Sequence, residues 1–257
     1  MKRKYAKKVS SIRTKLIIYF AVIILLSSGI LGYMSARGAT QSLTDEAQKS
    51  LSLIANESTK LIKSRIDAQI RILETIALNE GIKSMDWQVQ RRVLLEHIEG
   101  TNFLDLGIVT RDGYGLYPDG SNTYLGDNDF IQKAMNGQAA ISDLIISKVT
   151  NELVLMFAVP VKKDSNVAGV LVGRARGDNL VEMTRDMGYG EQGYTYMINS
   201  EGAVVAHPDS DMVFNRFNPL KERENDVTVE PLAVFFEKIL AERTGVGQCK
   251  IQNSYLK

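Results

Sequence analysis

Few residues of this 257-residue chain are of the types that enzymes use for covalent or acid–base chemistry. The chain has one cysteine, Cys249, and two histidines, His97 and His207. Nucleophilic catalysis needs a nucleophile beside a base, and nothing around Cys249 indicates such an arrangement. His207 precedes Pro208 and is predicted to have a structural role at the end of a strand. The sequence therefore predicts no enzyme activity and no catalytic residue.

The acidic residues do not follow a known metal-binding pattern. Asp127 and Asp129 are two residues apart, as in a calcium loop, but the glycine and the glutamate that complete such a loop are absent from the sequence. Asp127 is instead predicted to cap the helix that follows it. A single cysteine also excludes an internal disulfide and a cysteine-based metal site. We expect no metal and no cofactor.

The charge balance argues against nucleic acid as a partner. The chain has 31 Lys and Arg residues against 30 Asp and Glu residues, a net charge of +1. Nucleic-acid-binding domains are usually basic, with positive charge gathered on one face. No basic segment with interleaved aromatic residues occurs here, so we expect no nucleic-acid partner.

The elements that must position a binding site begin with an uncharged apolar run at residues 16–34. Its length suits a hydrocarbon core of about 30 Å. Seven basic residues and no acidic residue precede it, so residues 1–15 are expected in the cytoplasm and those after 34 outside. A cleaved signal peptide is the alternative, but its apolar segment is usually shorter and residues 36–39 are a poor cleavage sequence. We expect an uncleaved anchor in the plasma membrane.

A long helix is predicted after the anchor. Residues 39–79 contain neither proline nor glycine, and their apolar residues recur mostly at steps of three, four or seven. This pattern predicts a helix of about 40 residues and about 60 Å. The helix either lies solvated on its own domain or forms a stalk that packs against a second copy of the chain. We favour the stalk of a homodimer, with helical structure continuing to residue 100.

Two hairpin signals lie 89 residues apart in the sequence. Asp112-Gly113 and Glu201-Gly202 each separate two apolar runs, and glycine accepts the positive φ that tight turns need. The repeat predicts an α+β protein with two antiparallel sheet modules in tandem, residues 101–178 and 179–257. The second module is expected to lack its last strands, either because it is truncated or because it simply has fewer strands.

The first module is expected to have a five-stranded sheet with helices on one face. Its predicted elements are strands at 103–109, 114–117, 141–147, 153–161 and 167–175, a loop at 118–126 and a helix at 127–135. For the second module they are helices at 179–187 and 229–242, a hairpin at 194–198 and 203–206, a polar loop at 214–228 and a strand that begins at 245.

This order of elements resembles the double Cache sensor domain of bacterial transmembrane receptors, chiefly methyl-accepting chemotaxis proteins. The resemblance covers about residues 39–257. The stretches that carry it include residues 126–137 (GDNDFIQKAMNG), 141–143 (ISD), 169–173 (GVLVG) and 193–208 (GYTYMINSEGAVVAHP).

The resemblance implies PAS-like modules and the extracytoplasmic small-molecule sensor input of a chemotaxis receptor. In this reading residues 39–100 form the stalk helix and helical lead-in, 101–178 the membrane-distal module and 179–257 an incomplete membrane-proximal module. The alternatives are the sensor of a membrane diguanylate cyclase or histidine kinase, and a truncated anchored binding protein without signalling output.

The resemblance also implies a ligand pocket in the membrane-distal module. Family members that bind amino acids carry Arg-x-Trp-Tyr where this chain has residues 128–131, and an aspartate where it has Arg174. Because arginine forks bind carboxylates and phosphates, we expect a small carboxylate or other anion at Arg174. The alternative is an ordinary ion pair with Asp129, Asp143 or Asp178. The expected ligand-binding residues are Tyr117, Tyr124, Asn128, Phe130, Asp143, Ser147 and Arg174.

Overall fold

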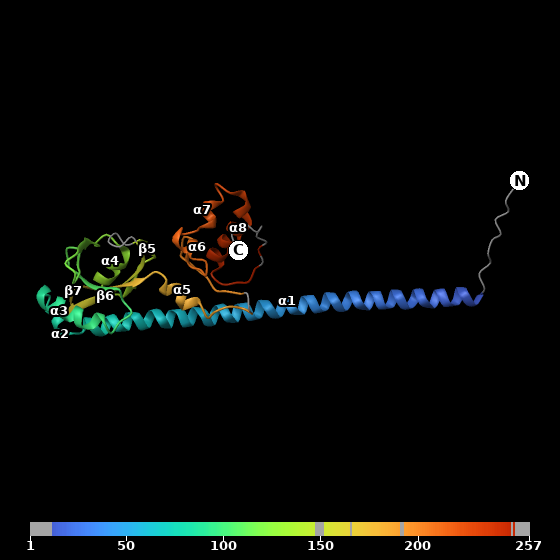
Figure 1. Cartoon of the computed structure of the whole chain (residues 1–257), viewed down its shortest axis with the longest axis horizontal. Coiled ribbons are helices and arrows are strands. Elements are labelled where there is room, and N and C mark those ends of the chain that lie inside the picture. The colour runs from blue at the N-terminus through green and yellow to red at the C-terminus, as the bar shows by residue number, and fades with distance from the viewer. Residues whose placement is uncertain (1–11, 147–151, 165, 191–192, 248, 250–257) are drawn as a thin grey trace. The chain divides into compact units, whose positions relative to one another are not determined.

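The computed structural model describes residues 12–146, 152–164, 166–190, 193–247 and 249, in two compact units, residues 1–51 and 52–257. Figure 1 shows the elements along the chain. In order they are α1 (Ile12–Ala77), α2 (Glu80–Lys83), α3 (Trp87–Ile98), β1 (Asp105–Val109), β2 (Tyr114–Leu116), β3 (Asn122–Tyr124), α4 (Asp129–Met135), β4 (Ala140–Ile141), β5 (Ile145–Ile146), β6 (Leu153–Lys163), β7 (Asn166–Arg176), α5 (Asn179–Thr184), β8 (Met197–Ile198), β9 (Val204–Ala206), α6 (Ser210–Phe214), α7 (Pro219–Glu222), the 3₁₀ helix η1 (Val227–Val229) and α8 (Glu230–Glu242).

Helix α1 confirms the predicted long helix and extends it toward the N-terminus. It runs for 66 residues, so the apolar run and the amphipathic segment belong to one helix. It ends at Ala77, two residues before the predicted end. Among the described residues, α1 is the one helix long and apolar enough to cross a membrane, and its most apolar window is not buried.

The first sheet is antiparallel and larger than predicted. Within the described residues it has seven strands in the order β3-β2-β1-β7-β6-β4, with β5 also paired to β6. The expectation of five strands was wrong for two reasons. The loop expected at 118–126 contains β3, and the strand expected at 141–147 is divided into β4 and β5.

The sheet is covered by helices on both faces, not on one as expected (Figure 1). One core joins Leu73 of α1 and Leu94 of α3 to Ile108, Phe157 and Leu171 of the sheet. All five side chains are at most 1% exposed. Glycine at position 173 permits this close packing, because a Cβ there would lie 2.8 Å from the Phe103 ring and 3.0 Å from Leu73 Cδ2.

A second core lies on the face that α4 covers. It includes Ile131 of α4 with Ala158 of β6 and Val172 of β7, all fully buried. Neighbouring residues of a strand point to opposite faces, so Leu171 contributes to the first core and Val172 to the second. Burial on both faces explains why β6 and β7 read as continuous apolar runs, without the alternation of a half-buried strand.

The predicted helix at 127–135 is confirmed, with a later start and a different cap. Helix α4 begins at Asp129, and Asn128 occupies its N-cap position without a capping side-chain hydrogen bond. Asp127 therefore does not cap this helix. Helix ends commonly differ by one or two residues between criteria, but the cap residue here is a different one.

The C-terminal part has a small sheet of β8 and β9, followed by short helices. Helix α8 begins one residue after its predicted start. The expectation of a polar loop over 214–228 was wrong, because α7 lies within it and η1 begins there. Asn218 and Asp226 cap these helices by accepting hydrogen bonds from Leu220 and Thr228. Residues 245–247 are not in a strand, and most of the remaining strand prediction falls outside the described residues.

The two predicted hairpin turns have the same hydrogen bonds. In each, the glycine N–H donates to the carbonyl three residues earlier, from Gly113 to Thr110 and from Gly202 to Asn199, both at 3.0 Å. The N–H of Thr110 or Asn199 then donates to the carbonyl four residues later, both at 2.9 Å. The glycine φ angles are +88° and +83°. The repeated sequence signal therefore corresponds to two equivalent turns.

Candidate functional site

A mostly buried ion pair joins two neighbouring strands in the middle of the first sheet. Arg174 of β7 and Asp105 of β1 are direct partners in the strand register, and Arg174 Nη2 donates to Asp105 Oδ2 at 3.1 Å. The two side chains are 14% and 17% exposed. Arg174 thus forms an ion pair, but the three partners expected for it pair elsewhere. Asp129 pairs with Lys133, Asp143 with Arg216 and Asp178 with Arg176.

Two further predicted residues lie on the same face of the sheet as Arg174. Tyr117 and Phe130 both belong to the core beneath α4, and the Arg174 guanidinium lies 6.0 Å from the centre of the Tyr117 ring. Phe130 is placed by the first turn of α4 and is buried. A guanidinium at this distance from an aromatic face is attracted to it. The fold therefore brings Arg174, Tyr117 and Phe130 to one face.

Burial sets the ionisation of this cluster. It raises the pKa of the Asp105 carboxyl, and the Arg174 guanidinium opposes that shift. Burial raises the pKa of Tyr117 to about 12, with a further contribution from the Asp105 carboxylate. The Tyr117 hydroxyl therefore keeps its proton at neutral pH and can donate a hydrogen bond. The cluster offers a small polar ligand a guanidinium, a carboxylate and a neutral hydroxyl.

Two other predicted residues, Tyr124 and Asn128, make their contacts away from Arg174 and Asp105. Tyr124 of β3 is 47% exposed, and its hydroxyl donates to Asp127 at 3.4 Å. Asn128 donates from Nδ2 to the carbonyl of Leu125 at 2.9 Å. Both side chains thus stabilise the turn that leads into α4, and these two contacts do not join them to Arg174.

Asp143 faces the C-terminal part of the chain. Its Oδ2 accepts a hydrogen bond from Asn199 at 2.6 Å and lies 3.6 Å from Nη2 of Arg216. Asn199 is the first residue of the second hairpin turn, so Asp143 connects the first sheet to that turn. The prediction for Ser147 falls outside the described residues.

Asp105 is the member of the cluster that the sequence prediction missed. It opens β1, and its partner is 69 residues away in the chain. An acidic residue at the start of a strand is common and carries no signal by itself. Its role follows from the register of β1 against β7, which local patterns do not reveal.

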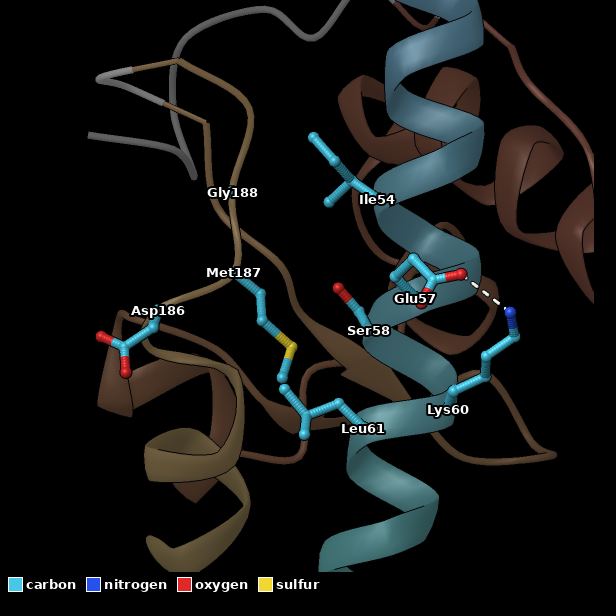
Figure 2. Close-up of a pocket in the computed structure, with 8 residues that line it drawn as sticks. All are labelled: Ile54, Glu57, Ser58, Lys60, Leu61, Asp186, Met187 and Gly188. Carbon is cyan, nitrogen blue, oxygen red and sulfur yellow. Dashed lines mark hydrogen bonds and ion pairs between the residues drawn. The ribbon is translucent and has the colours of Figure 1, made fainter.

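A hollow of about 550 Å³ lies between α1 and the chain that follows α5. Figure 2 shows Leu61 and Met187 pointing toward one another beside Ser58, with Glu57 accepting a hydrogen bond from Lys60 at 2.8 Å. The Glu57 and Lys60 side chains are 60% and 64% exposed, and exposed pairs contribute little to binding or stability. The hollow therefore marks the meeting of two segments, and Ser58 is the buried polar residue among those that line it.

His207 is buried in a small aromatic cluster. Its Nδ1 accepts from the backbone N–H of Asp209 at 2.9 Å, so Nδ1 carries no proton and Nε2 is the protonated nitrogen. Nε2 lies 3.3 Å from the Tyr194 hydroxyl, and the two rings meet edge to face. Burial lowers the pKa of His207. The imidazole holds the start of α6, whose N-cap is Asp209.

The described chain combines a candidate membrane-spanning helix, a seven-stranded and a two-stranded antiparallel sheet, and a charged cluster beneath α4. Residues 39–249 match the family model of the Cache domain, and the chain belongs to this family.

Curated relatives of the chain are chemoreceptors. The chain is 21% identical over 209 residues to the methyl-accepting chemotaxis protein PscA of Pseudomonas syringae, which covers 79% of this chain and 33% of that protein. It is 21% identical over 216 residues to the methyl-accepting chemotaxis protein McpG of Pseudomonas putida, with 80% and 33% covered. The chain therefore spans about a third of the length of these relatives.

Solved structures with the same fold are chemoreceptor ligand-binding domains. The domain of Pseudomonas fluorescens CtaA, in complex with L-leucine, superposes with a TM-score of 0.57 at 17% identity over 71% of this chain and 78% of that chain. The domain of Pseudomonas aeruginosa PctB, in complex with L-Arg, gives a TM-score of 0.56 at 19% identity over 65% and 73%. Identities this low establish the fold alone.

Proposed function

We propose that the chain is the extracytoplasmic sensor input of a transmembrane chemotaxis receptor. Its Cache family membership and the methyl-accepting chemotaxis proteins among its relatives support this role. They favour chemotaxis over a cyclase or kinase output. The apolar run in α1 and the basic residues before it support a plasma-membrane anchor at 16–34, with residues 1–15 cytoplasmic and later residues outside.

The proposed sensor has a membrane-distal module, residues 101–178, and a membrane-proximal module, residues 179–257. The two equivalent turns and the two separate sheets support this division. Leucines that remain exposed along α1, among them Leu43 at 72% and Leu53 at 63%, support the packing of this helix against a second copy of the chain.

The ligand of the distal module is a small carboxylate bound at Arg174, flanked by Tyr117 and Phe130. The observation that carries this proposal is a mostly buried guanidinium, 14% exposed, on the face beneath α4, since arginine binds carboxylates through paired hydrogen bonds. Tyr124, Asn128, Asp143 and Ser147 stay predictions as further contacts.

Asp105 narrows the class of carboxylate. A negatively charged ligand beside the Asp105 carboxylate is repelled by it. This repulsion is offset if the ligand also carries a group that donates a hydrogen bond to Asp105. A hydroxyl or ammonium group next to the ligand carboxylate meets this need. We therefore favour small hydroxy acids or amino acids over simple di-anions.

Signalling follows if the ligand binds one arrangement of sheet and α1 more tightly than another. A ligand shifts such an equilibrium only by its difference in affinity for the two states. Arg174 lies on β7, and β7 packs on α1 through Gly173 and Leu73, so this strand connects the proposed site to the stalk.

Calorimetric titration of the whole chain in detergent with lactate, glycine and succinate tests the ligand proposal. We expect lactate or glycine to bind, and binding to weaken about tenfold or more in the double variant Asp105→Asn with Arg174→Gln, which leaves no uncompensated buried charge. Arg176→Gln is the matched control, because Arg176 lies on the same strand and is 66% exposed.

Failure of all three acids to bind, or equal affinity in the double variant and the control, would overturn the ligand proposal. The receptor role has its own test. Deletion of the gene should abolish the capillary-assay response of the native strain to the acid that binds, and an unchanged response would contradict a receptor.

A further inference from the structure

A second cavity lies on the α1 side of the first sheet, the face opposite Arg174. It measures about 330 Å³, close to the lower end of the range of about 300–1,000 Å³ for small-molecule pockets. Its walls come from α1, from Asn102 in the turn before β1, and from α5. Three segments far apart in the sequence therefore meet around it.

Three side-chain amides line this cavity: Gln69, Asn102 and Asn179. In the part of the chain that the structure describes, none of them has a hydrogen bond from its side chain to another residue. Gln69 Oε1 is moreover buried. Buried polar groups are nearly always hydrogen-bonded, so the buried Gln69 Oε1 indicates a polar occupant. Asn179 is half-buried and Asn102 is exposed, so both amides are accessible to the same occupant.

The charged groups at the cavity already have partners. Arg65 Nη1 donates to the carbonyl of Met183, near the end of α5, at 2.7 Å. Glu182 forms an ion pair with Arg185. Arg65 and Glu182 carry opposite charges and each already has a partner. The cavity therefore offers an ionic ligand no free counter-charge. The occupant is selected by the amides.

We propose that this cavity binds a small uncharged polyhydroxyl compound, such as a monosaccharide or polyol. A carboxamide offers both donors and an acceptor, and a hydroxyl group can satisfy either. A charged ligand would pay a larger desolvation cost without a free counter-charge. The bound compound contacts α1 and α5 together, so it stabilises the arrangement in which Arg65 holds the end of α5. The site is independent of the acid site proposed at Arg174.

Equilibrium dialysis of the whole chain in detergent against labelled ribose, glucose and glycerol tests this proposal. Dialysis is preferred to a thermal shift, because sugars and polyols stabilise proteins generally by exclusion from the surface. We expect saturable binding of at least one probe, weakened about tenfold or more by Gln69→Leu and by Asn179→Ala, each of which removes a hydrogen-bonding amide.

Gln88→Leu is the matched control, since Gln88 is an exposed glutamine of α3, and it should bind as the parent does. Gln69→Leu should fold, because an apolar side chain of similar size replaces a buried group without a described partner. No saturable binding of any probe, or equal binding by parent and both cavity variants, would overturn the proposal. Loss of binding in the Asp105→Asn, Arg174→Gln double variant, with Gln69→Leu unaffected, would assign the sugar to the acid site instead.

Discussion

Arg174 on β7 lies directly across from Asp105 on β1, and its guanidinium donates to the Asp105 carboxylate at 3.1 Å. Both side chains are mostly buried. The pair lies on the α4 face, where the neighbouring residues Val170 and Val172 of the same strand are fully buried. A charge in such surroundings depends on its partner, so the pair governs both what this face can bind and how stable it is.

Removing one member of this pair should be worse than removing both. Breaking a buried ion pair costs about 3–5 kcal/mol, because the remaining charge is left uncompensated. We expect Arg174→Gln to lower the free energy of unfolding by about 3 kcal/mol and the double variant with Asp105→Asn to lower it less. Urea unfolding measures both. A loss in the double variant equal to the sum of the losses in Arg174→Gln and Asp105→Asn alone would show that the two side chains contribute independently.

Alanine in place of glycine should destabilise the two equivalent turns to different extents. At Gly113 and Gly202 a positive φ costs alanine about 1 kcal/mol. A Cβ at Gly113 would also lie 2.9 Å from the backbone of Gly126, whereas at Gly202 it would meet the flexible end of Leu220. We therefore expect Gly113→Ala to destabilise more than Gly202→Ala in urea unfolding.

Gly120→Ala is the matched control for these turns. Its φ is +90° and nothing lies within 4 Å of the added Cβ, so it reports the backbone cost alone. We expect its destabilisation to be the smallest of the three. If Gly120→Ala cost as much as Gly113→Ala, the close approach to Gly126 would contribute nothing.

Gly173→Ala should loosen the packing of α1 on the first sheet. The added Cβ would lie 2.8 Å from the Phe103 ring and 3.0 Å from Leu73 of α1, and overpacking a core costs about 1–3 kcal/mol. Hydrogen exchange of the amides around Leu73 should become faster. Gly100→Ala, whose nearest neighbour would be 3.8 Å away, should leave this exchange unchanged, and unchanged exchange in both variants would contradict the packing role.

The elements that were predictable from sequence are those with a long local pattern. Helix α1 has many turns of apolar periodicity, α8 has a clear amphipathic pattern, and β6 and β7 are each eleven residues of mostly apolar character. In each case the signal lies in neighbouring residues. A long local pattern, whether periodic as in the helices or continuously apolar as in β6 and β7, is the strongest signal in a sequence.

What could not be predicted depends on few residues or on distant pairing. Strand β3 has three residues and α7 has four, too few for a period to show, and both lie in polar stretches that read as loops. The partner of Arg174 depends on the register of two strands whose paired residues are 69 apart in the chain. Asp129, Asp143 and Asp178 lie nearer to Arg174 in the sequence than Asp105 does, so the sequence alone offered no reason to choose Asp105.

The stability of the C-terminal part should fall as the pH falls below about 6.5, the ordinary pKa of histidine. Burial lowers the pKa of His207 in the folded state, so over the interval between the two values the unfolded chain binds more protons than the folded one. The contribution of His207 is therefore fully present above the unfolded pKa and is lost as the pH falls through the folded one. Thermal unfolding midpoints between about pH 5 and 8 measure this.

His207→Asn should flatten this pH dependence while keeping much of the structure, because the asparagine oxygen can replace Nδ1 as acceptor for the N–H of Asp209. The same change at His97, the other histidine of the chain, is the matched control. A His97→Asn variant should keep the parent's fall in the unfolding midpoint at low pH. If His97→Asn removed that fall and His207→Asn did not, the buried imidazole beside Tyr194 would not be the group that titrates.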